Sequence, residues 1–169
     1  MLSLTTAIIL AASPVAPAAS DDLRTPTPDL HRAVLSAVAT TRDAVSGLFH
    51  WATHSVSLDR YLAQQQALDV GRGVQSAAER FTAMTADLSS DQRSRVLAEV
   101  TTIRDALAKA ESLVGKLQVE AGAASADPVE VRLLASELYG TLAGMQEIQQ
   151  AIGNKLGLPG EAPAEIRAR

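Results

Sequence analysis

Apolar and small side chains recur along most of the chain at alternating intervals of four and three residues, the spacing of one face of an α-helix. The clearest stretch covers residues 88–158, where two such series flank Asp127-Pro128. An isolated helical hairpin with this pattern gains too little in water to be stable alone, so further helices must pack against it. The first series contains Val96, Val100, Ile103, Leu107, Ala110, Val114, Leu117 and Ala121, and the second contains Val131, Leu134, Leu138, Met145, Ile148 and Ile152.

The same spacing continues through the first half of the chain. A helix is predicted from Thr27-Pro28-Asp29 to about Ser55, and another from Ser57-Leu58-Asp59 to about Leu88. The pattern does not decide between two helices and one continuous helix. The predicted inward positions are Leu30, Val34, Ala37, Thr41, Ala44, Leu48 and Trp51 in the first segment, and Tyr61, Leu68, Val74, Ala78, Phe81 and Leu88 in the second.

Two glycines, Gly71 and Gly73, fall inside the second predicted helix. Each costs up to about 1 kcal/mol relative to alanine in a helix interior. They coincide with a slip in the apolar spacing between Leu68 and Val74. A local kink or a close contact between helices would explain them, and a functional hinge is the alternative.

Helix boundaries are well marked in the second half. Ser89 and Gln92 have the spacing of a capping box, and Gly122 is expected to end that helix in a left-handed conformation. Asp127-Pro128 then begins the last helix, which should stop near Gly157. Four long amphipathic segments with short connections predict an all-α fold, an antiparallel up-down-up-down four-helix bundle over residues 27–158.

Composition agrees with one compact domain that has an aliphatic core. The 169 residues are 47% hydrophobic but include only two Phe, two Tyr and one Trp. A net charge of -4 with dispersed basic residues offers no concentrated positive face, so nucleic acid is not expected as a partner. Cysteine is absent, which excludes disulfides, thiol nucleophiles and thiolate metal sites.

The N-terminal sequence suggests export. An apolar run over residues 2–12 precedes Ala16-Pro17-Ala18, which fits the A-x-A pattern of a signal-peptide cleavage site, although no Lys or Arg precedes the run. A disordered Ala/Pro-rich leader is the alternative. The run is too short for a transmembrane helix. We therefore expect a secretory signal peptide at 1–19, a linker at 20–26, a flexible C-terminal tail at 159–169, and a periplasmic or secreted protein.

One pair of residues has the spacing of metal ligands. His50 and His54 lie four apart on a predicted helix and can present two imidazole nitrogens to one ion. The bundle topology places Glu120 and Glu130 at the same end, as it does Asp59 and Asp127. We therefore predict a divalent metal site for Zn, Ni, Cu or Co formed by His50, His54, Glu120 and Glu130. The alternative is that the histidines are solvated or face a partner, because inward Trp51 turns His50 outward.

The segment Leu88-Ser89-Ser90-Asp91-Gln92-Arg93 resembles the LTxxQ motif of the periplasmic Spy, CpxP and ZraP group of envelope-stress and heavy-metal resistance proteins. The helix-turn-helix over residues 88–158 is similar too. The resemblance implies an exported helical dimer that shields unfolded proteins or senses metal, with His50 and His54 matching the HxxxH ligand pair of some members.

No arrangement typical of an enzyme is visible, because no serine or threonine has a recognisable neighbouring base. We therefore expect a non-enzymatic helical-bundle protein of the cell envelope that acts in stress protection or in heavy-metal binding or sensing. Its expected partners are unfolded client proteins or a metal ion, and unused apolar surface would favour a homodimer. The alternative is a structural or interaction module without metal, such as a sensor-like ectodomain or a phasin-like surface-coating protein.

Overall fold

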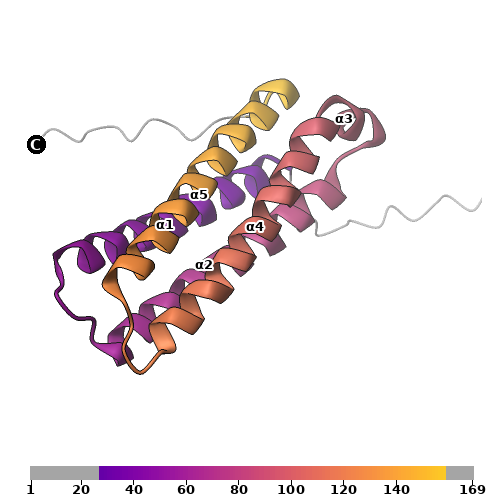
Figure 1. Cartoon of the computed structure of the whole chain (residues 1–169). Coiled ribbons are helices and arrows are strands. Elements are labelled where there is room, and N and C mark those ends of the chain that lie inside the picture. The colour runs from indigo at the N-terminus through magenta and orange to yellow at the C-terminus, as the bar shows by residue number, and fades with distance from the viewer. Residues whose placement is uncertain (1–26, 159–169) are drawn as a thin grey trace, which may run out of the picture.

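The protein is described by a computed structural model over residues 27–158. Within that range all regular structure is helical, which confirms the predicted all-α class (Figure 1). The predicted signal peptide, linker and C-terminal tail lie outside the described residues. None of the described helices has both the length and the apolar character needed to cross a bilayer. The helices are α1 (Thr27–His54), α2 (Arg60–Asp87), α3 (Ser90–Arg95), α4 (Leu97–Gly122) and α5 (Pro128–Leu156).

The four long helices form an antiparallel bundle (Figure 1). The Thr27 hydroxyl at the start of α1 donates to the carboxylate of Asp87 at the end of α2. Lys155 near the end of α5 forms a 2.5 Å ion pair with Glu99 near the start of α4. Both α1 and α4 pack against α2 and α5, so the order around the bundle is α1, α2, α4, α5. Helices α1 and α4 therefore lie diagonally across the core.

The predicted caps are present. Asp59 Oδ1 accepts from the Leu62 amide at 2.8 Å, and the non-helical residues 55–59 separate α1 from α2 as distinct helices. The capping box at Ser89 is complete: its hydroxyl accepts from the Gln92 amide, and its own amide donates to Gln92 Oε1 at 2.9 Å. Asp127 caps α5 with proline at the first helical position, and Gly157 ends it.

Two details of the third predicted helix were wrong, although it ends at Gly122 as expected. Gly122 does not adopt a left-handed conformation; among the described glycines only Gly157 does, with φ 67°. The third predicted helix is also broken at Val96 (φ −120°, ψ 16°), which divides it into α3 and α4. The break accompanies full burial of Val96, whereas α3 itself buries no residue.

The predicted inward face of α2 was partly wrong. Tyr61 is 74% exposed and Leu68 is at the surface, whereas alanines occupy much of the buried face. The buried face follows an unbroken four-three spacing, so the apparent slip near Gly71 does not exist. In α1, similarly, Ala44 is exposed, and Leu30, Ala37 and Trp51 are only partly buried. The buried hydrophobic positions of α2 are Ala63, Ala67, Val70, Val74, Ala77, Phe81 and Met84.

The two interior glycines of α2 serve close packing between helices. A Cβ at Gly73 would lie 2.9 Å from Thr41 Cγ2 of α1, and one at Gly71 would lie 3.1 Å from Val114 Cγ1 of α4. Both separations are below ordinary contact distance, and α2 continues through both positions without a break. The close approach of α1 and α4 at these two positions therefore supports the close-contact explanation.

A polar cluster lies inside the aliphatic core between α1, α2 and α5. His31 is fully buried, and Gln149 Nε2 donates to its Nδ1 at 2.8 Å while lying 3.0 Å from Met84 Sδ. A Cβ at Gly153 would be only 2.6 Å from His31 Nε2, so the ring packs directly on the α5 backbone. Within the described residues, His31 Nε2 and Gln149 Oε1 have no hydrogen-bond partner. Burial lowers the pKa of His31 because the charged ring would lose its hydration.

We predict that the free energy of unfolding falls as pH decreases below about 6.5, the ordinary pKa of histidine. Below that pH the unfolded chain binds a proton at His31 that the folded protein does not bind, because the folded pKa is lowered. Urea unfolding between pH 7 and pH 5 measures the effect. The His31→Leu variant should lose this part of the pH dependence of the unfolding free energy. The His50→Gln/His54→Gln control should keep it. Equal slopes in wild type and His31→Leu would contradict the assignment.

Candidate functional site

The predicted histidine pair is present on the surface. His50 and His54 are both exposed in the last turns of α1, and their ring centroids lie 4.4 Å apart in an edge-on arrangement. The i, i+4 spacing therefore brings the two rings together as predicted. The pair can supply two ligands from one helix face, which is half of a tetrahedral metal shell.

The predicted glutamates lie at the same end of the bundle but have other surroundings. Glu120 Oε1 accepts a 2.8 Å hydrogen bond from the Asp127 amide, so it braces the connection between α4 and α5. Glu130 is exposed in the first turn of α5. Both carboxylates line a shallow hollow between α4 and α5 together with Lys116. A lysine beside them is a competing cation rather than a metal ligand.

The bundle order explains why the four predicted ligands do not form one site. Glu120 belongs to α4, which lies diagonally opposite the α1 helix of His50 and His54. Glu130 belongs to α5 but lines the α4 side of that helix. Over residues 27–158, no three or more His, Asp or Glu side chains are grouped as a metal would require. Residues at the same end of the bundle therefore need not lie close to one another.

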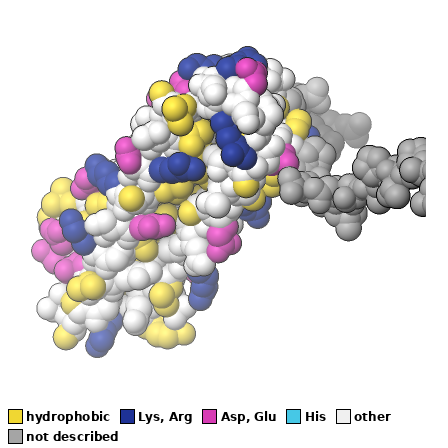
Figure 2. Space-filling model, turned by 90° about the vertical axis from the view of Figure 1, so that its right-hand side faces the viewer, with side chains coloured by type: hydrophobic (Ala, Val, Ile, Leu, Met, Phe, Trp, Pro, Cys, Tyr) yellow, Lys and Arg dark blue, Asp and Glu magenta, His cyan; other side chains and the backbone are white. Residues whose placement is uncertain are grey.

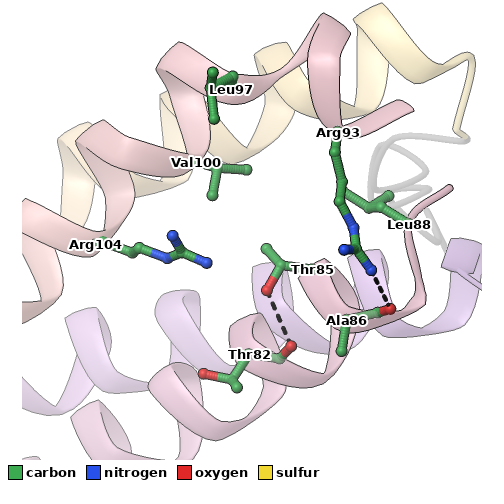
Figure 3. Close-up of a pocket in the computed structure, with 8 residues that line it drawn as sticks. All are labelled: Thr82, Thr85, Ala86, Leu88, Arg93, Leu97, Val100 and Arg104. Carbon is green, nitrogen blue, oxygen red and sulfur yellow. Dashed lines mark hydrogen bonds between the residues drawn. The ribbon is translucent and has the colours of Figure 1, made fainter. Parts of the chain in front are cut away.

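A larger hollow lies at the other end of the bundle, between the end of α2 and the start of α4. This α2–α4 groove has a volume of about 440 Å³ (Figure 3), within the usual range for sites that bind small molecules. Its floor is formed by Leu88, Val100 and Thr85, which are at most 9% exposed. The remaining lining residues are Thr82, Ala86, Arg93, Leu97 and Arg104.

The groove lies beside the break at Val96, with lining residues from both α3 and α4. Arg93 of α3 reaches across and donates from Nη2 to the Ala86 carbonyl at 2.8 Å. Arg104 projects from α4 toward Thr82 and Thr85 (Figure 3). The described lining of the groove thus has an apolar floor, two guanidinium groups and no carboxylate.

A second feature distinguishes the end where α1 meets α2 and α4 meets α5. Exposed large hydrophobic side chains lie around this connecting end, several of them more than half exposed. Hydrophobic side chains also reach the surface at the lower end of the face in Figure 2. The residues of this apolar end are Phe49, Val56, Tyr61, Leu62, Val119, Val129 and Leu133.

Sequence reasoning did not find the groove. Basic residues are dispersed along the chain, but Arg93 and Arg104, on either side of the break at Val96, line the same hollow. The signal for the break was weak, because Val96 fits the continuous helical spacing of its neighbours. Two arginines eleven positions apart do, however, share one helix face in principle.

Comparison with known proteins adds no relative: no protein family, no curated protein and no solved structure matches this chain.

The histidine pair allows a direct test of metal binding. We predict that any Ni²⁺ or Zn²⁺ bound by the purified protein in calorimetric titration is lost in the His50→Ala/His54→Ala variant and unchanged in Glu120→Gln/Glu130→Gln. The reason is that the two rings are adjacent, whereas both glutamates line the hollow between α4 and α5. Loss of binding in the glutamate variant would show that the four ligands do combine.

Proposed function

We propose that this protein is a non-enzymatic helical-bundle protein of the cell envelope that protects unfolded polypeptides by binding their apolar segments. The observation that carries the proposal is the apolar end. Seven of the ten exposed large hydrophobic residues of the described chain lie there, whereas single exposed apolar residues are normally scattered. Concentration at one end favours an interaction surface.

The chemistry of the apolar end suits a non-native client. Its side chains are spread over the α1–α2 connection and four helix ends rather than gathered into one deep pocket. Such a surface can contact varied apolar segments weakly, as binding of unfolded chains requires, and does not select one shape. Charged residues such as Arg60, Asp127 and Glu130 lie among them and keep the surface hydrated.

The non-enzymatic part of the proposal is based on the surroundings of the hydroxyl and imidazole groups. Within the described residues, hydroxyls such as those of Thr53 and Thr141 donate to helix carbonyls four residues earlier, which is structural rather than activating. His31 is enclosed in the core. His50 and His54 contact each other, and neither forms a hydrogen bond to a described carboxylate that would orient a catalytic base.

Location in the envelope is the part of the proposal that depends on the N-terminal sequence. The apolar run and Ala16-Pro17-Ala18 support export. The resemblance of residues 88–93 to the LTxxQ motif is in keeping with it. The same hexapeptide also contains the capping box at Ser89 and Gln92, so its local role is explained without a relative. An interaction module without metal is the alternative function, and its signature would be self-association through the apolar end.

We predict that the protein suppresses aggregation of reduced insulin, measured by light scattering, and that the Tyr61→Ser/Val119→Ser/Leu133→Ser variant needs at least fivefold more protein for the same effect. These side chains are 56–77% exposed, so the substitutions should change stability little. The control is Leu97→Ser, which removes an exposed leucine at the other end of the bundle.

No suppression by the wild type at tenfold excess, or equal suppression by the triple variant, would contradict the client proposal. Light scattering of the protein alone separates the alternative. A wild-type dimer that becomes a monomer in the triple variant would assign the apolar end to self-association. Matching circular dichroism melting curves would show that all variants are folded.

Export gives a separate prediction. N-terminal sequencing of the mature protein, recovered from cells that express the full chain, should begin near Ala19 or Ser20, because cleavage follows the small-residue pattern at 16–18. A protein that retains Met1 would contradict the signal-peptide assignment and remove the envelope from the proposed function. It would leave client binding at the apolar end unaffected.

A further inference from the structure

We propose that the α2–α4 groove binds a single-chain aliphatic carboxylate, with the alkyl chain on the groove floor and the carboxylate between Arg93 and Arg104. This site is at the opposite end of the bundle from the apolar end. The proposal is therefore independent of client binding and extends the protein's function to a small amphipathic ligand.

The floor of the groove provides the apolar half of the site. Leu88 and Val100 belong to the core yet face the hollow, and Leu97, 63% exposed, stands at its mouth. In Figure 3 the side chains of Leu97 and Val100 point from α4 into the opening between the helices. An alkyl chain lying on these residues would cover a leucine that is otherwise exposed to water, which is favourable in proportion to the apolar area removed.

The polar half of the site is cationic. Arg104 and Arg93 project from α4 and α3 on two sides of the hollow, and no aspartate or glutamate is among its lining residues. Within the described chain Arg104 forms no ion pair, and Arg93 uses one nitrogen for the Ala86 carbonyl. A guanidinium group has five N–H donors, so both arginines retain donors for a carboxylate.

The hydroxyl groups in the lining do not compete for this role. Thr85 Oγ1 donates to the Thr82 carbonyl at 3.0 Å, and Thr82 Oγ1 donates to the Ala78 carbonyl at 2.9 Å. Each hydroxyl proton is therefore used, and the two threonines present methyl groups and lone pairs to the hollow. The anion must then be held by the arginines, which makes the site dependent on charge.

The backbone of the groove favours an alkyl ligand over a peptide. The long walls are helices, whose amides and carbonyls are paired within the helix, and the Ala86 carbonyl also accepts from Arg93. A peptide segment in the hollow would leave its own backbone groups without partners, at a cost in free energy. An alkyl carboxylate has no polar group apart from its head.

The test uses the full-length protein and decanoate below its micelle concentration, followed by isothermal titration calorimetry. We expect saturable binding that is at least tenfold weaker in Arg104→Gln, and at least tenfold weaker for decanol and for acetate with the wild type. Arg104→Lys should retain part of the affinity because the charge remains. The matched control is Arg72→Gln on the exposed face of α2, which should bind decanoate as the wild type does.

Several results would overturn the proposal. These are no saturable decanoate binding by the wild type, equal affinity in Arg104→Gln, or decanol binding as tightly as decanoate. Tighter binding of a short peptide with a free C-terminal carboxylate would assign the groove to a peptide instead. A Leu97→Asp variant provides a second check, since a carboxylate at the mouth should repel decanoate. Circular dichroism melting of each variant separates loss of binding from loss of fold.

Discussion

The order of the helices around the bundle is the constraint on which the other features depend. Short connections join α1 to α2 and α4 to α5, so these pairs must be antiparallel neighbours, and each of α1 and α4 contacts both α2 and α5. One end of the bundle then contains both short connections, and the other contains α3 and the groove. The diagonal relation of α1 and α4 separates Glu120 from the histidine pair. A correct fold prediction thus did not guarantee a correct site.

Helix boundaries could be predicted from the sequence because caps are local. Asp59, Ser89 and Asp127 each satisfy a backbone amide within three residues, so the signal is contained in a short stretch of chain. The same reasoning gave the correct end of α4 at Gly122 but the wrong conformation, because Ala123 follows in an extended conformation and no left-handed residue is present there. Many residues can occupy such an extended position, and glycine is favoured but not required.

Which face of α2 is buried could not be predicted from hydrophobicity alone. Ala63, Ala67 and Ala77 are fully buried because α1 and α4 approach α2 closely, whereas the larger Tyr61 and Leu68 remain at the surface. A prediction that buries the largest apolar residues gives the opposite result. Here the small residues are buried because they lie where the helices approach most closely. The burial of His31 was missed for a related reason. Its site depends on Gly153 and Gln149, more than a hundred residues away in sequence, which leave a space of the right shape.

The short helix α3 gives the molecule a region that can open on its own. It buries no residue and is held by its capping box and by hydrogen bonds from Arg93 and Arg95 to the Ala86 and Lys155 carbonyls, whereas the long helices share one core. Native-state hydrogen exchange typically distinguishes such segments, because their amides open without unfolding the core. Opening of α3 would carry Arg93 away from the Ala86 carbonyl while Val96, Val100 and Arg104 stay in place. The groove would then have one fixed wall and one movable wall, so its entrance could widen at little cost to the stability of the bundle.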